Sequence, residues 1–144
     1  MTQPRDREQR PLDPPRSRGP VGLWLVGAKG GVATTAITGL AALARGAIEP
    51  VGLVTAGADF AALDLVDFAD IVVGGHDIRP GRLGDEARRM WVESRAITPE
   101  TLDAAADTFA RVEERIRPGT VVAAGDKIRE LADPALRSEE HTSE

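Results

Sequence analysis

Residues 21–35 read VGLWLVGAKGGVATT, and this stretch decides the fold. Its first part, Val21–Val26, is a continuous apolar run followed by glycine, which is typical of a strand buried in a parallel sheet. The glycine-rich segment Gly27–Gly31 comes next, and apolar residues then recur at helical spacing from Val32 to Arg45. A strand, a glycine loop and a helix in this order place unpaired backbone N–H groups where a phosphate binds. The stretch therefore predicts a nucleotide- or phosphate-binding loop.

Strands and helices are predicted to alternate along the rest of the chain. Short apolar runs predict strands at Pro50–Thr55, Asp70–Gly75 and Gly119–Ala124. Helical spacing predicts one helix over Leu83–Arg95 and another that opens at Thr98-Pro99 and continues to Ile116. We therefore expect an α/β fold, an incomplete Rossmann-like parallel sheet of about four strands with helices on both faces.

The usual strand order of this architecture, 3-2-1-4-5-6, sets the neighbours of each predicted strand. In that order the fourth predicted strand, Gly119–Ala124, pairs with the first, and its outer edge has no neighbour. An exposed apolar edge favours strand pairing between molecules. We therefore expect the chain to self-associate or to dissolve poorly.

The chain divides into three segments. Residues 1–18 hold four prolines, eight charged residues and no glycine, and they predict a disordered leader rich in proline and arginine. Residues 137–144, RSEEHTSE, match the in-frame translation of a sequencing adapter, so we expect them to be an artefact outside the natural protein. Residues 19–136 then form the folded part, which we interpret as the N-terminal part of a Rossmann-like domain.

Composition argues against several classes of function. Lys and Arg number 18 against 23 Asp and Glu, a net charge of −5, which is unsuited to sequence-independent nucleic-acid binding. Cysteine is absent and the only histidines are His76 and His141, so we expect no thiolate or histidine-rich metal site. The longest strongly apolar run, Val21–Ala28, is too short to span a bilayer. We expect a cytoplasmic protein without nucleic-acid or membrane partners.

Two classes of nucleotide site compete for the glycine loop. Lys29-Gly30-Gly31-Val32 resembles the deviant P-loop of ParA-like ATPases, but Ala33 leads directly into Thr34-Thr35, and the second lysine of that loop is missing. A dinucleotide site needs no such lysine, because backbone amides hold the pyrophosphate. The strict Gly-x-Gly-x-x-Gly pattern is absent, however, and Thr55 stands where the second predicted strand usually ends in an acid.

A second motif follows the third predicted strand. Gly74-Gly75 permits a turn at its carboxyl end, and Asp77 offers a carboxylate to hydroxyl or amine groups of a ligand. The glycine loop ending in Thr34-Thr35, together with Gly75-His76-Asp77-Ile78, resembles inositol-3-phosphate synthase (myo-inositol-1-phosphate synthase). That family has tryptophan at the position of His76 and asparagines in the loop where Gly31 and Val32 stand.

The resemblance implies that the chain contains the N-terminal part of an NAD-binding domain. It assigns no catalytic residue and no metal ligand here. We interpret Trp24 and Trp91 as packing groups and His76 as a packed turn residue. The residues that it implies for cofactor binding are Gly27, Lys29, Gly30, Gly31, Val32, Asp77, Thr120 and Val121.

The resemblance also implies an activity for the parent protein. Such isomerases convert glucose 6-phosphate to 1L-myo-inositol 1-phosphate, for inositol and phospholipid biosynthesis, and use NAD as a hydride carrier that is regenerated. The family's catalytic lysines follow the cofactor segments, so we expect this chain to be inactive alone and the parent to be a homo-oligomer. Three alternatives stay open: the NAD-binding domain of another oxidoreductase, a degenerate P-loop ATPase, and a non-catalytic interaction domain.

Overall fold

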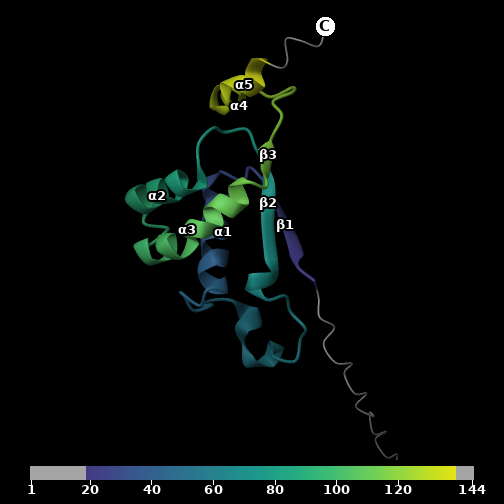
Figure 1. The fold of residues 1–144 in the computed structure, drawn as a ribbon, viewed down its shortest axis with the longest axis vertical. Helices are drawn as coiled ribbons and strands as arrows, with labels where there is room; N and C mark the ends of the chain where they lie inside the picture. Colours follow the sequence, from purple (N-terminus) through teal and green to yellow (C-terminus); the bar gives the residue numbers. More distant parts are fainter. Residues whose placement is uncertain (1–18, 139–144) are drawn as a thin grey trace, which may run out of the picture.

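The computed structural model describes residues 19–138 (Figure 1). The predicted leader at 1–18 and most of the predicted adapter segment lie outside the described residues. Short 3-10 turns occupy part of the segment between the first helix and the second strand. The elements are, in chain order, β1 (Val21–Val26), α1 (Gly31–Ala44), β2 (Ile71–Asp77), α2 (Leu83–Ser94), α3 (Pro99–Glu113), β3 (Ile116–Pro118), α4 (Asp126–Leu131) and α5 (Pro134–Ser138).

The three strands form one parallel sheet in the order β1-β2-β3. β1 pairs with β2 along its whole length, from Val21 opposite Ile71 to Val26 opposite His76. The short β3 pairs with the carboxyl end of β2, where Gly75 lies opposite Ile116. The predicted α/β class and the incomplete Rossmann-like sheet are therefore confirmed, as are the helices at α1, α2 and α3.

Two of the predicted strands are wrong. Residues 50–55 form a turn, with Gly52 at φ +80° and the amide of Leu53 bonded to the carbonyl of Pro50, and a 3-10 helix follows at Val54–Ala56. Val51 is 91% exposed, so this apolar run has no sheet to cover it. Residues 119–124 follow β3 as a loop with Ala123 in the left-handed region, at φ +56°. The strand in that region, β3, lies earlier and is shorter than predicted.

The predicted strand order is also wrong, for the same reason. Since residues 50–55 form no strand, the next strand along the chain, β2, takes the place beside β1. β3 then pairs with β2 on its other side, and β2 is the central strand. The free edges of the described sheet therefore belong to β1 and β3, and no strand near residues 119–124 pairs with β1.

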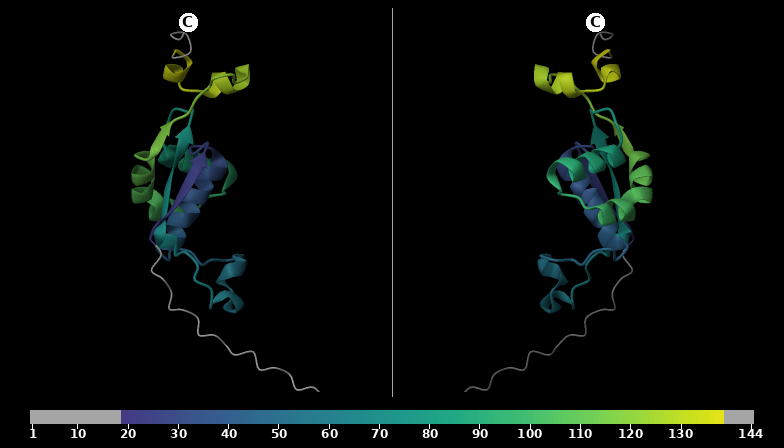
Figure 2. Two further views of the ribbon diagram at one scale, coloured as in Figure 1. Left: turned by 90° about the vertical axis from the view of Figure 1, so that its right-hand side faces the viewer. Right: turned by 90° about the vertical axis from the view of Figure 1, so that its left-hand side faces the viewer.

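The three long helices cover one face of the sheet (Figures 1 and 2). Leu23, Leu25 and Val73 point to this face and pack against a core built by α1, α2 and α3. The expectation of helices on both faces is therefore wrong for the described residues. Successive right-handed crossovers that advance in one direction, from β1 to β2 to β3, place their helices on the same side. The core consists of Ile37, Ala41, Val73, Leu83, Ala87, Ile97, Ala105, Phe109 and Val112.

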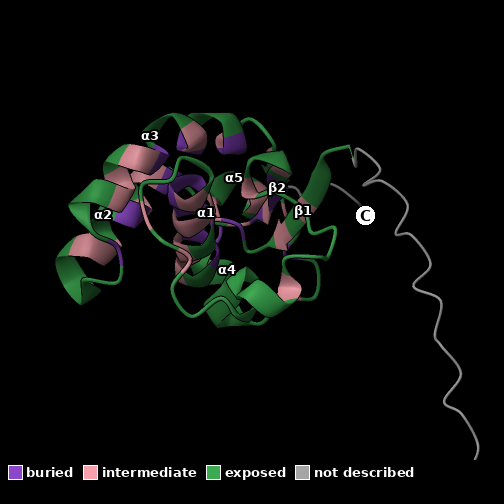
Figure 3. Ribbon diagram, turned by 90° about the horizontal axis from the view of Figure 1, so that it is seen from below, coloured by how far each residue is buried: buried purple, intermediate pink, exposed green. Residues whose placement is uncertain are grey.

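The other face of the sheet has no helix over it among the described residues, and most of β1 is exposed (Figure 3). Trp24 on this face is 55% exposed and lies against Gly74, where a Cβ would approach its ring to 2.9 Å. Val72, its neighbour on β2, is 38% exposed. The packing role expected for Trp24 therefore holds on one side of its ring only.

A methyl group at Gly75 tests the close approach of β1 and β2. A Cβ there would overlap the carbonyl oxygen of Leu25 and approach Cβ of Ala28 to 2.9 Å. We expect Gly75→Ala to lower the free energy of unfolding by about 1–3 kcal/mol, measured in urea. The matched control is Gly39→Ala in α1, where no atom lies within 4 Å; it should raise stability by about 0.5–1 kcal/mol. Equal stability of the Gly75→Ala variant and the unsubstituted 144-residue chain would contradict this packing.

The uncovered sheet face predicts concentration-dependent association. Exposed apolar side chains on a flat, open sheet favour contact between molecules. We expect Val72→Lys to reduce the association measured by sedimentation velocity, whereas Val51→Lys, in the exposed turn away from the sheet, should not. If the unsubstituted 144-residue chain stays monomeric at high concentration, this face does not mediate self-association.

Candidate functional site

The glycine loop between β1 and α1 is held over the carboxyl end of β2. The amides of Gly27 and Ala28 both donate to the carbonyl of His76, at 2.8 and 3.1 Å. Gly27 has φ +81°, a left-handed conformation that glycine adopts without strain. The amide of Gly30 donates back to the carbonyl of Gly27 at 2.9 Å, which closes a tight turn. The loop is thus a defined turn that leads directly into α1.

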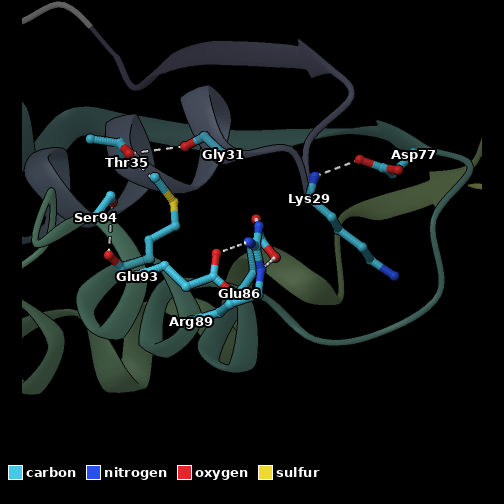
Figure 4. Close-up of polar contacts among 9 residues, drawn as sticks. Lys29, Gly31, Thr35, Asp77, Glu86, Arg89, Glu93 and Ser94 are labelled. Atoms are coloured by element: carbon cyan, nitrogen blue, oxygen red, sulfur yellow. Dashed lines mark hydrogen bonds and ion pairs between the residues drawn. The ribbon is translucent and has the colours of Figure 1, made fainter.

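The Asp77 carboxylate joins this loop to the end of β2. Asp77 is 7% exposed, and its Oδ2 accepts the backbone amide of Lys29 at 2.5 Å (Figure 4). Its Oδ1 accepts the amide of Arg79 at 2.7 Å. Hydrogen bonds from backbone N–H groups to a carboxylate are charge-assisted and stronger than neutral ones. The carboxylate therefore fixes both the glycine loop and the segment that follows β2.

The position of Asp77 corrects an expectation about the acid of a dinucleotide site. The sequence predicts that the second strand ends at Thr55, a position where dinucleotide-binding sheets usually have an acidic residue. Because residues 50–55 form no strand, the second strand is β2, and its last residue is Asp77. An acidic residue thus ends the strand beside β1.

The first turn of α1 presents backbone amides beside this loop. The first amide of the helix that bonds backward is that of Thr34, which donates to Gly30 at 2.9 Å. The amides of Gly31, Val32 and Ala33 precede it and have no partner within the helix. Their partial positive charge and that of the helix dipole favour an anion here. The site therefore has the backbone groups that a pyrophosphate requires.

A cavity of about 720 Å³ opens at the carboxyl ends of all three strands. The glycine loop and Asp77 form one side of it, and apolar side chains from β1, β3, the segment after β2 and α4 form much of the rest. A crevice at the carboxyl ends of parallel strands is where ligands bind in open α/β sheets. The lining residues are Val26, Gly27, Gly30, His76, Asp77, Ile78, Arg79, Pro118, Gly119, Thr120, Ile128 and Leu131.

Four of the predicted binding residues line this cavity, namely Gly27, Gly30, Asp77 and Thr120. Gly31 and Val32 lie at the start of α1, where their contribution is the backbone amide, since the Val32 side chain is 89% exposed. Val121 is buried at 2% exposure and does not line the cavity.

The Lys29 side chain also lies outside the cavity. Its Nζ donates to the carbonyl of Arg79 at 3.3 Å, and it lines a separate hollow of about 180 Å³ with Arg79, Arg82 and Arg89. The contribution of Lys29 to the loop is therefore its backbone amide, which donates to the Asp77 carboxylate and so fixes the loop.

Sequence reasoning missed several cavity residues. His76 and Ile78 flank Asp77 in the Gly-His-Asp-Ile motif, and their position next to a strand end was a usable signal. Ile128 and Leu131 come from α4, a short helix after the last strand for which no expectation was made. Its place depends on tertiary contacts, such as the bond from the amide of Asp133 to the carbonyl of Ile78 at 2.7 Å.

Arg89, a cation on α2, is already paired. Arg89 forms ion pairs with Glu86, at 2.5 Å, and with Glu93 (Figure 4). The hydrogen bond with Glu86, followed by the charges of Glu86 and Glu93, raises the pKa of the Arg89 guanidinium above its usual value. Arg89 therefore stays charged, and its guanidinium is paired with two carboxylates.

The threonines after the loop do not face the cavity. Thr35 Oγ1 donates to the carbonyl of Gly31 at 2.9 Å, with Met90 Sδ at 3.7 Å, and Thr34 is fully buried. In a P-loop the hydroxyl at this position holds magnesium beside the phosphates. The geometry weighs against the ATPase alternative.

Comparison with known proteins agrees with the geometry. The family model described as myo-inositol-1-phosphate synthase, an NAD-binding domain, matches residues 21–133. No curated protein matches the chain. In the part of the chain that the structure describes, no helix is both long and apolar enough to cross a membrane. The matched range contains all three strands, the glycine loop and the cavity, and the chain belongs to the myo-inositol-1-phosphate synthase family, as part of its NAD-binding domain.

Proposed function

We propose that this chain binds NAD in the cavity at the carboxyl ends of β1, β2 and β3. The observation that carries the proposal is the glycine loop, which the Asp77 carboxylate holds at the start of α1. The free amides of the first helical turn and the size of the cavity, about 720 Å³, fit a dinucleotide. Gly30 supports this fit, because a Cβ there would come within 3.1 Å of the carbonyl of Gly27 and disturb the turn.

Each predicted residue has a distinct role in this proposal. The amides of Gly31 and Val32, in the first turn of α1, donate to the pyrophosphate, whereas Gly27 and Gly30, whose own amides bond within the turn, allow its close approach. Lys29 holds the loop through its amide, and its charged side chain adds positive potential nearby.

Asp77 and the loop after β3 complete the binding site. Each carboxylate oxygen of Asp77 retains a lone pair after binding one amide, so it can also accept a ribose hydroxyl. Thr120 offers a hydroxyl at the cavity wall, although this oxygen also accepts the amide of Val122 at 3.2 Å. Val121 is buried, and its packing supports that loop.

In the parent enzyme we propose that this domain serves the conversion of glucose 6-phosphate to 1L-myo-inositol 1-phosphate. NAD, when bound, supplies reversible hydride transfer to and from the sugar. The residues of this chain bind and orient the cofactor; none of those lining the cavity is assigned to the sugar. Family membership supports this activity and, with it, a homo-oligomeric parent in the cytoplasm.

The nucleotide preference separates this proposal from the P-loop alternative. We expect NAD⁺ to bind the 144-residue chain and ATP with magnesium to bind at least tenfold more weakly, because neither threonine hydroxyl faces the cavity. Isothermal titration calorimetry with each ligand measures both affinities. Tight ATP binding that requires magnesium would support the ATPase instead, and no binding of either nucleotide would support an interaction domain.

Asp77→Asn tests the carboxylate that holds the loop. The asparagine amide directs an N–H group toward one of the two backbone donors, so one hydrogen bond is lost and the charge is removed. We expect the affinity for NAD⁺ to fall about tenfold and the free energy of unfolding to fall by about 1–3 kcal/mol. Asp103→Asn, on the exposed side of α3, is the matched control and should change neither value. Unchanged NAD⁺ affinity in a folded Asp77→Asn variant would contradict the role of Asp77.

An activity assay on the chain alone tests whether it binds the cofactor without catalysing the reaction. We expect no formation of inositol phosphate from glucose 6-phosphate and NAD⁺, because the cavity residues supply cofactor binding and no group for the sugar chemistry. Product detection by phosphorus NMR, with a purified synthase as positive control, makes the measurement. Clear turnover would show that the chain contains a complete active site.

A further inference from the structure

Trp24 and His76 form a hydrogen-bonded pair at the edge of the proposed NAD cavity. Nε1 of Trp24 donates to Nδ1 of His76 at 3.1 Å, across the paired strands β1 and β2. The two rings meet edge to face, with centroids 5.1 Å apart and planes at 72°. Both side chains lie on the sheet face that no described helix covers, and His76 also lines the cavity.

The indole N–H determines which imidazole nitrogen carries the proton. A nitrogen that accepts a hydrogen bond has no proton, so in neutral His76 the proton is on Nε2. Within the described residues, His76 Nε2 makes no hydrogen bond. His76 thus has a fixed donor without a protein acceptor.

The cavity wall around this donor is largely apolar. Val26, Ile78, Pro118, Ile128 and Leu131 all contribute to the lining. The adjacent carboxylate of Asp77 already accepts two backbone amides, and successive residues of a strand point to opposite faces. An apolar wall with a donor at its edge suits a flat, partly polar ring.

We propose that His76, held by Trp24 in the form protonated on Nε2, donates a hydrogen bond to an acceptor nitrogen of the adenine ring of bound NAD. This inference rests on the proposed function, because it places the pyrophosphate at the glycine loop and the ribose near Asp77. His76 precedes Asp77 on β2 and lines the same cavity as the apolar residues. His76 is then a specificity-determining contact, and Trp24 is a positioning residue that acts through it.

Three substitutions separate a donor from a merely space-filling ring. His76→Phe keeps a ring and removes the donor, and we expect the affinities for NAD⁺ and for AMP to fall about tenfold. His76→Gln places an amide N–H near the position of Nε2 and should restore both to within about threefold of the parent chain. Trp24→Phe keeps an aromatic ring without the indole N–H and should weaken both about two- to threefold. Trp91→Phe, on α2 away from the cavity, is the matched control.

The ligand series locates the contact. Titration calorimetry on the 144-residue chain uses NAD⁺, AMP and ribose 5-phosphate, with folding of each variant checked by its urea midpoint. A contact with adenine predicts that His76→Phe weakens NAD⁺ and AMP by the same factor and leaves ribose 5-phosphate unchanged. Nitrogen-15 NMR of the imidazole at a pH where it is neutral should show a proton on Nε2 and none on Nδ1, and Trp24→Phe should shift this balance.

The outcomes distinguish this inference from the proposed function. If the parent chain binds NAD⁺ and AMP, and His76→Phe binds them equally well, the inference is overturned and NAD binding stands. Equal loss in His76→Gln and His76→Phe would overturn the donor role, as would a proton on Nδ1 of the neutral ring. If the parent chain binds neither NAD⁺ nor AMP, the proposed function fails, and this inference fails with it.

Discussion

The carboxylate of Asp77 connects the parts on which the site depends. It accepts amides from the glycine loop, at Lys29, and from the segment after β2, at Arg79, while its backbone carbonyl accepts the amide of Gly119 after β3 at 2.8 Å. Connections from three strands thus meet at one buried residue. A buried carboxylate is costly without partners, so the two amides and the carboxylate stabilise each other's positions. The loop that faces the cavity is therefore positioned before any ligand binds.

The one-sided sheet follows from the same chain path. Right-handed crossovers from β1 through β2 to β3 leave α1, α2 and α3 on one face, where Val73 and Phe109 join the core. The opposite face keeps Trp24 and Val72 partly exposed. This arrangement gives Trp24 room to lie across Gly74 and to bond His76, so the topology that exposes apolar surface also arranges the edge of the cavity.

Local patterns were sufficient where local forces decide the structure. The apolar runs at β1 and β2 and the start of α3 at Thr98-Pro99 are short-range signals, and the structure confirms them. The run at residues 50–55 failed because three apolar residues interrupted by Gly52 can form a turn as readily as a strand.

The site was predictable to a similar degree. The glycine loop and Asp77 follow from the motif, whereas the partners of Asp77 and the Trp24–His76 bond depend on which strand lies beside β1. That neighbour is set by tertiary pairing across some 50 residues, which no local pattern reports. Strand order is the point at which sequence reasoning reached its limit.

The central claim is that the fixed glycine loop at the start of α1 binds NAD through its backbone. Proton–nitrogen correlation NMR of the labelled 144-residue chain during an NAD⁺ titration reports on each of these amides separately. The structure predicts that the largest saturable shifts occur at the free amides of residues 31–33, with smaller ones at Gly27, Gly30 and Thr120. Saturable shifts confined to other regions, or no shifts at millimolar NAD⁺, would contradict it.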